Sequence, residues 1–252
     1  MKRFNLFFAL FYAVSVHAQK VPALNQKTAV LVVGKDVGAY AAEELNGLSE
    51  VFLSHGIFVY KFYYPNADWT TIQKAAQNCS FFVYSGHGYS NGGLNGGFGG
   101  IYVNDFVNAE EFTQVIHFKQ HPLIIIQCSC GASGGSAGDK GDIGFEVAKK
   151  RILDTALPYF IAGAGAYFAT NWLGGSKEFL TEFLKGKTLE VASVETLDWV
   201  IDEKITRTIN SSTVLDEKVI YLGIANNESK KSYSLAYVGD SNFTSMNIGK
   251  GK

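Results

Sequence analysis

The chain has 252 residues, 47% of them hydrophobic and 14% aromatic, and its formal net charge is −1. This length suits one large α/β domain, and the apolar content is enough for a full core. The near-neutral charge, without a run of like charges, argues against a nucleic-acid partner and a charged disordered tail. We find no linker and no internal repeat, so we expect a single domain over residues 19–252.

The N-terminus has the pattern of a secretory signal peptide. Basic residues at positions 2 and 3 precede an apolar run over 6–14, and Val16 and Ala18 are small residues before a cleavage point at Gln19. A membrane anchor is the alternative, but the run is shorter than the roughly 18 residues that a span needs. We therefore predict a signal peptide over 1–18, a secreted or periplasmic protein, and no membrane span.

Short apolar runs alternate with segments of helical spacing along the chain. Buried strands are predicted at 28–34, 57–64, 81–84, 123–126 and 159–162, with closing strands at 219–222 and 234–238. Helices are predicted at 40–54, 69–77, 108–116, 145–153, 176–185 and 189–205, with Asp68 as an N-cap. Strands that are apolar on both faces predict an α/β fold: a three-layer sandwich with a mainly parallel sheet.

Two glycine-rich loops interrupt this pattern, at 86–100 and 131–144. The first lacks the Lys-Ser/Thr pair of a phosphate-binding loop, so a flap over a site is the use we expect.

Two strand ends carry residues suited to nucleophilic catalysis. The apolar strand at 81–84 runs into His87-Gly88, and the strand at 123–126 runs into Cys128-Ser129-Cys130. The carboxyl ends of neighbouring parallel strands, about 4.8 Å apart, meet at one edge of a sheet. A histidine and a cysteine brought together there can form a nucleophile and its base, with the Gly88 N–H as an oxyanion donor.

These two motifs resemble those of caspase-like cysteine peptidases, the group of metacaspases, gingipains, clostripain and legumain. Residues 82–88, Phe-Val-Tyr-Ser-Gly-His-Gly, resemble the histidine strand of that group, and residues 127–131, Gln-Cys-Ser-Cys-Gly, resemble its cysteine strand. A Gly-Asp pair at 239–240 is similar to a weaker element of some bacterial members. The resemblance implies a caspase-like fold and a cysteine endopeptidase that cleaves protein or peptide substrates through a Cys-His dyad, without a cofactor.

The cysteine motif departs from the family pattern by one position. Laid on the caspase pentapeptide Gln-Ala-Cys-x-Gly, the chain puts Ser129 at the nucleophile position, with a cysteine on each side. If side chains alternate as in a strand, Cys128 and Cys130 share a direction that Ser129 opposes. We favour Cys130 because it lies furthest past the strand and precedes a small-residue turn. Cys128 is the second choice, and a catalytically inactive binding or scaffold protein is the alternative function.

The sequence gives only a weak indication of which P1 residue the enzyme would prefer. In metacaspases an acidic residue two places before the nucleophile helps to bind a basic P1 side chain, and Cys128 occupies that place if Cys130 is the nucleophile. Asp139 or Asp142 in the following loop would then supply the negative charge. A small or uncharged P1 residue is the rival expectation.

The remaining cysteines and histidines give weaker signals. Cys79 precedes its strand and Cys130 follows the next, about 20 Å away along the sheet, so they cannot form a disulfide. A Cys128–Cys130 bridge would close a tight, strained ring. His117 and His121 have the i, i+4 spacing of metal ligands on a helix but lack the glutamate of the zinc-protease motif. We expect no metal, and nothing in the sequence indicates the oligomeric state.

Overall fold

The computed structural model describes residues 21–23, 25–89, 100–171, 174–227 and 230–250. The predicted signal peptide over 1–18 and residues 90–99 of the expected flap lie outside these ranges. Within them, no helix combines the length and apolar character needed to cross a membrane.

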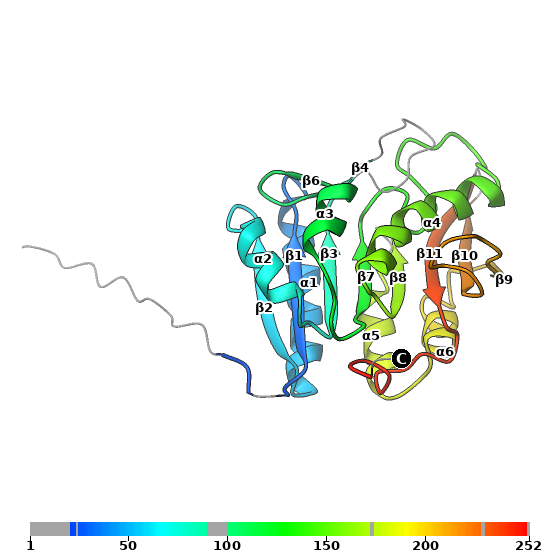
Figure 1. The fold of residues 1–252 in the computed structure, drawn as a ribbon. Helices are drawn as coiled ribbons and strands as arrows, with labels where there is room; N and C mark the ends of the chain where they lie inside the picture. The colour runs from blue at the N-terminus through cyan, green and yellow to red at the C-terminus, as the bar shows by residue number, and fades with distance from the viewer. Residues whose placement is uncertain (1–20, 24, 90–99, 172–173, 228–229, 251–252) are drawn as a thin grey trace, which may run out of the picture.

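An eight-stranded sheet runs through the molecule in the order β2-β1-β3-β7-β8-β11-β10-β9 (Figure 1). Its first five strands are parallel: β2 (Phe58–Tyr63), β1 (Thr28–Val33), β3 (Phe81–Ser85), β7 (Leu123–Gln127) and β8 (Ala166–Thr170). The last three are antiparallel: β11 (Lys230–Gly239), β10 (Val219–Asn227) and β9 (Glu203–Thr208). A small second sheet holds β4 (Gly88–Tyr89), β5 (Gly100–Tyr102) and β6 (Phe106–Asn108).

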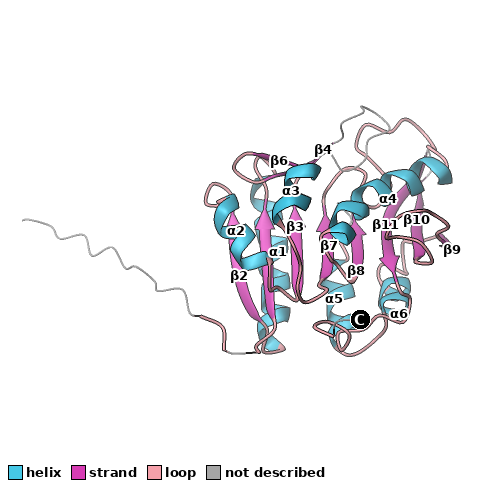
Figure 2. Cartoon of the chain, in the orientation of Figure 1, coloured by secondary structure: helices cyan, strands magenta, loops and turns pink. Residues whose placement is uncertain are grey.

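Helices cover both faces of the large sheet (Figure 2). One face packs against α1 (Gly38–Ser54), α5 (Ser176–Leu184) and α6 (Leu189–Glu195). The other packs against α2 (Trp69–Ala76), α3 (Ala109–Val115) and α4 (Phe145–Ile161). Side chains of β1 alternate between the two hydrophobic cores, one on each face of the sheet. Ala29 and Leu31 lie in the core with α1, whereas Val30 and Val32 lie in the core on the opposite face. The predicted three-layer α/β class is confirmed.

Side-chain caps fix the starts of α2 and α3. Asp68 caps α2 as predicted, because its Oδ2 accepts a hydrogen bond from the Thr71 N–H at 2.8 Å. Asn108 does the same for α3, accepting from the Glu111 N–H at 2.8 Å.

Two predicted elements are wrong. The apolar run at 159–162, predicted as a strand, is the last turn of α4, and the next strand is β8, which begins four residues later. Tyr159 is fully buried while Ile161 is 55% exposed, so the run has one buried face, and a short apolar run does not distinguish a buried strand from such a helix. The helix predicted at 189–205 ends at Glu195, and the last three residues of the predicted range are the start of β9.

The sheet order brings together the two strands with the candidate catalytic motifs. Strands β3 and β7 are parallel neighbours, with Ser85 opposite Gln127 at their carboxyl ends. The loops that carry His87 and Cys130 therefore leave the sheet side by side.

Candidate active site

The backbones of the two loops touch at Gly88. A Cβ atom added there would lie 2.8 Å from the Cys130 nitrogen and from the Ser129 Oγ, and closer still to the Cys130 carbonyl oxygen. All three distances are below any that a real side chain adopts, so only glycine permits this approach. The structure thus brings the backbones of Gly88 and Cys130 together, and the convergence of the His87 and Cys130 side chains stays a prediction.

His87 is exposed, and a backbone carbonyl orients its ring. Its Nε2 lies 3.2 Å from the carbonyl oxygen of Asp36, in the loop after β1. A carbonyl only accepts hydrogen bonds, so Nε2 must be the donor. In a neutral ring, the lone pair then lies on Nδ1, where it can accept a proton. Asp36 presents its carbonyl from a left-handed backbone conformation, with φ of 62°.

The Tyr84 hydroxyl hydrogen-bonds to the backbone of the turn that carries His87. This side chain on β3 is buried, and its hydroxyl lies 3.0 Å from the His87 carbonyl oxygen and 3.3 Å from that of Tyr102, either of which can accept its proton. The same hydroxyl accepts a hydrogen bond from the Tyr102 N–H at 3.1 Å. One buried hydroxyl therefore ties the histidine turn to the small second sheet.

The backbone of Cys128 does not have the extended conformation of a strand. Strand β7 ends at Gln127, and Cys128 has a left-handed φ of 57°, so the expected alternation of side chains does not apply here. Burial raises the pKa of its thiol; the nearby Ser85 hydroxyl opposes this shift and the Glu44 charge adds to it.

Cys130 begins a tight turn and is partly exposed. Gly131 follows with φ of 83°, its N–H donates to the Gly135 carbonyl at 2.8 Å, and its carbonyl accepts from the Gly134 N–H at 3.0 Å. Both cysteines of the motif are free thiols. Within the described part of the chain, the hydrogen bonds of His87 do not include either thiol.

A groove of about 530 Å³ opens between α1 and α5. Tyr40 and Glu44 from α1 line this groove, and both interact electrostatically with the Cys128 thiol. Glu178 and the 81% exposed Trp199 lie in the same lining. The groove therefore combines aromatic side chains with charges of both signs, because Lys177 lines it together with Glu44, Glu178 and Glu182.

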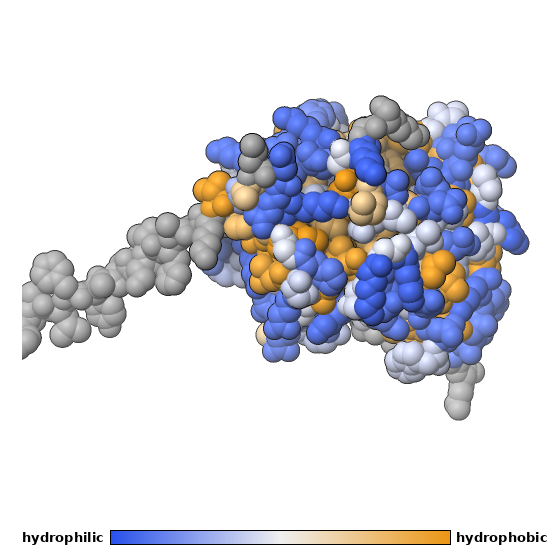
Figure 3. Space-filling model, turned by 90° about the horizontal axis from the view of Figure 1, so that it is seen from below, coloured by the Kyte–Doolittle hydropathy of each residue, from blue (hydrophilic) through white to orange (hydrophobic). Residues whose placement is uncertain are grey.

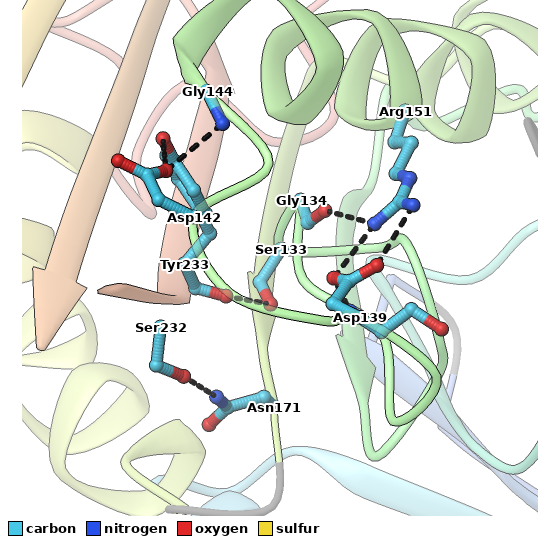
Figure 4. Close-up of polar contacts among 10 residues, drawn as sticks. Ser133, Gly134, Asp139, Asp142, Gly144, Arg151, Asn171, Ser232 and Tyr233 are labelled. Carbon is cyan, nitrogen blue, oxygen red and sulfur yellow. Dashed lines mark hydrogen bonds and ion pairs between the residues drawn. The ribbon is translucent and has the colours of Figure 1, made fainter. Parts of the chain in front are cut away.

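Asp139 forms an ion pair with Arg151 inside the protein (Figure 4). Its carboxylate makes two hydrogen bonds with Arg151 of α4, at 2.8 and 2.9 Å, and also accepts from the Ser136 N–H at 2.7 Å. The two side chains are only 9% and 4% exposed, respectively, and Arg151 also donates to the Gly134 carbonyl at 3.1 Å. The structure thus gives Asp139 a loop-bracing role, in contrast to the free negative charge expected for a substrate.

Asp142 differs, because it is exposed. Its Oδ1 accepts from the Gly144 N–H at 2.9 Å and from the Tyr233 hydroxyl at 3.1 Å, and no ion pair forms with it among the described residues (Figure 4). Its role toward a substrate stays a prediction.

The weaker metal signal does not form a site. Helix α3 ends at Val115, so His117 and His121 do not share a helix face, and His121 has a left-handed φ of 47°. The described residues contain no group of three or more His, Cys, Asp or Glu side chains placed to hold a metal ion. Cys79 is buried and unpaired.

Comparison with known proteins gives a distant structural likeness. No protein-family model and no curated protein sequence matches the chain. Among solved structures, the chain is similar to the Drosophila initiator caspase Dronc, with 13% sequence identity, 85% of each chain covered and a TM-score of 0.36.

Sequence reasoning missed Asp36, Tyr84 and Glu44. In the sequence, Tyr84 is indistinguishable from the other apolar residues of its strand. The one available signal was its hydroxyl, because a buried tyrosine hydroxyl usually has a hydrogen-bond partner. Asp36 acts through its backbone carbonyl, which leaves no signature in the residue type. Glu44 reads as the solvated face of a helix, and only the tertiary fold shows that it lies beside Cys128.

We expect the Arg151–Asp139 pair to brace the loop after Cys130. Asp139→Asn removes the carboxylate charge that pairs with the buried Arg151, and removing one partner of a buried pair costs about 3–5 kcal/mol. Asp142→Asn is the matched control and should cost less than about 1 kcal/mol, because its side chain is exposed. Urea unfolding of the two variants measures both values, and equal losses would contradict a bracing role for Asp139.

We expect Cys128 to react slowly with iodoacetamide at pH 7, because its raised pKa keeps the thiol protonated. Glu44→Gln removes one cause of that rise, so the thiolate fraction and the labelling rate should increase, by less than the tenfold of one pKa unit. Glu43→Gln, on the exposed side of α1, is the control and should leave the rate unchanged. Peptide mapping against time measures the Cys128 rate, and a slower rate in Glu44→Gln would refute this electrostatic account.

Proposed function

We propose that this protein is a secreted, caspase-like cysteine endopeptidase with a Cys130–His87 dyad. The observation that carries the proposal is the backbone contact between Gly88 and Cys130, next to an imidazole whose Nε2 donates to the Asp36 carbonyl. The motif resemblance at 82–88 and 127–131 supports the same chemistry. Secretion rests on the signal-peptide pattern at 1–18.

The reaction follows from these positions. The Cys130 thiol proton passes to His87 Nδ1, and the thiolate attacks the carbonyl carbon of the scissile peptide bond. The Gly88 N–H donates to the oxyanion, and His87 returns the proton to the departing amine as the C–N bond breaks. His87 then takes a proton from a water molecule, which attacks the thioester, breaks the C–S bond and releases the acid and free Cys130.

Two observations support Cys130 over Cys128 as the nucleophile. Burial and the Glu44 charge raise the pKa of the Cys128 thiol, opposite to the lowering that activates a catalytic cysteine. Cys130, in contrast, is the residue whose backbone contacts Gly88. We therefore give Cys128 no catalytic role; it interacts with Tyr40 and Glu44, which line the groove.

A catalytically inactive scaffold is the second candidate. One observation favours it: the described hydrogen bonds connect His87 to the Asp36 carbonyl and to neither cysteine. In this case the groove would bind a partner without cleaving it.

The groove also supports a preference for a basic P1 side chain. Glu44 lies beside Cys128, whereas Asp139 is neutralised by Arg151 and Asp142 lies in the loop further along. We therefore add Glu44 to Asp142 as a source of negative charge for the substrate, and we assign no such role to Asp139. An uncharged P1 residue is the rival.

The dyad is tested by single substitutions assayed on a mixed peptide library. Cys130→Ala and His87→Ala should each lower kcat/KM at least about a hundredfold, because each removes one half of the nucleophilic pair. Cys128→Ala and His55→Ala, the latter an exposed histidine at the end of α1, should stay within about tenfold of wild type. Unchanged cleavage in Cys130→Ala or His87→Ala would show the dyad to be wrong. Binding of uncleaved peptides by the wild-type chain would favour the scaffold.

The P1 preference is tested with a positional-scanning peptide library. Glu44→Gln should reduce cleavage after Arg and Lys relative to uncharged residues by about tenfold, since one charge interaction is lost. Asp142→Asn measures the second acid, and Glu43→Gln is the control. A basic preference that survives both changes would remove these acids from the explanation, and a wild type that prefers uncharged P1 residues would overturn the preference itself.

A further inference from the structure

A second cavity, of about 530 Å³, lies at the opposite end of the sheet from the cysteine motif. The turn between α4 and β8 and the segment after β11 form most of its wall, and the loop before β10 closes one side. Parallel strands begin at this end, whereas His87 and Cys130 follow strand ends. Figure 3 views the molecule from this end, where apolar atoms are bordered by hydrophilic ones.

The floor of this basal cavity is apolar. Phe160, Ala164 and Phe243 line it and are 7%, 8% and 8% exposed. Gly165 lets the Phe243 ring approach the backbone, because an added Cβ would lie 2.8 Å from that ring. A flat apolar group therefore has two aromatic rings to pack against.

Positive charge surrounds this floor. The Lys218 Nζ lies 5.1 Å from the centre of the Phe160 ring, and Lys250 lines the cavity from the C-terminal segment. His121 also lines it, and its Nδ1 donates to the Gly163 carbonyl at 3.1 Å. The one carboxylate among the described residues of the lining is that of Asp240, which is exposed and accepts from the Asn242 N–H at 2.9 Å.

A third lysine adds to the positive charge near the cavity. Lys27 donates to the Ser245 carbonyl at 2.5 Å, and its pKa is lowered by burial and by the charge of Lys250. The ammonium groups of Lys27 and Lys250 repel each other, and an anion bound at Lys250 would relieve that repulsion.

We propose that the basal cavity binds a small amphipathic organic anion, with a flat apolar body against Phe160 and Phe243 and an anionic head between Lys218 and Lys250. The volume falls within the roughly 300–1,000 Å³ of small-molecule sites, which combine an apolar lining with a few placed charges. The basal cavity and the cysteine motif use different residues, so this binding does not depend on peptidase activity.

A pair of fluorescent probes tests the proposal on the full chain. The anion is 1-anilinonaphthalene-8-sulfonate, and the control is N-phenyl-1-naphthylamine, which has the same ring system without the sulfonate. The sulfonate should bind with one-to-one stoichiometry and at least about tenfold more tightly than the neutral probe, with the difference reduced by salt.

Four variants locate the binding. Lys218→Gln and Lys250→Gln should each weaken sulfonate binding about tenfold and leave the neutral probe unaffected, whereas Lys74→Gln, on the exposed side of α2, should change neither. Ala164→Leu fills the floor and should abolish binding of both probes, with a thermal melt to check that it folds. Because the two lysine variants alter partly exposed side chains, they test the proposal even if Ala164→Leu fails to fold.

Three results would overturn the proposal. Sulfonate binding that is unchanged in both lysine variants would exclude the cationic rim. Equal affinity for the two probes would show that the site selects no anion. Full binding by a folded Ala164→Leu protein would place the probe outside the basal cavity.

Discussion

The contact between the backbones of Gly88 and Cys130 is the constraint on which the candidate site depends. Parallel pairing of β3 and β7 sets the distance between the two loops, and the absence of a side chain at position 88 lets them close onto each other. Any Cβ there would push the Cys130 backbone away. The buried Tyr84 hydroxyl holds the carbonyl of His87, so the histidine turn cannot move freely in response.

The same fold places the two cysteines in different electrostatic surroundings, although they are two residues apart. Cys128 lies close to the negative charge of Glu44, in a partly buried position that favours the neutral thiol. Cys130 lies beyond it at the start of a turn, against Gly88. The buried Arg151–Asp139 pair then fixes the loop that follows to α4. Breaking such a pair leaves a charge in a buried setting, so we expect it to hold the loop in place.

Much of the architecture was predictable because it follows from apolar periodicity and capping chemistry. The strands at 81–84 and 123–126 were found as continuous apolar runs, and Asp68 was found as a cap from its residue type and position. The run at 159–162 was misassigned because a short buried stretch is equally apolar in a helix and in a strand. The small sheet of β4 to β6 was missed because its strands have only two or three residues each.

The candidate site was predictable as a pair of strand ends but not in its detail. The meeting of Gly88 and Cys130 follows from the sheet order, which alternating strands and helices suggest. The left-handed backbone of Cys128 could not be read from a residue type that rarely adopts it. The pairing of Asp139 with Arg151, twelve residues later, depends on how α4 packs on the loop, which has no local sequence signal.

The most direct test of the central claim is the position of a covalent adduct. The protein would be treated with a peptidyl acyloxymethyl ketone that carries Lys at P1, and the modified residue would be mapped by mass spectrometry. The thiolate displaces the carboxylate leaving group, so a Cys130–His87 dyad predicts a single thioether at Cys130 that is lost in His87→Ala. An adduct at Cys128, or equal labelling of Cys130 with and without His87, would contradict it.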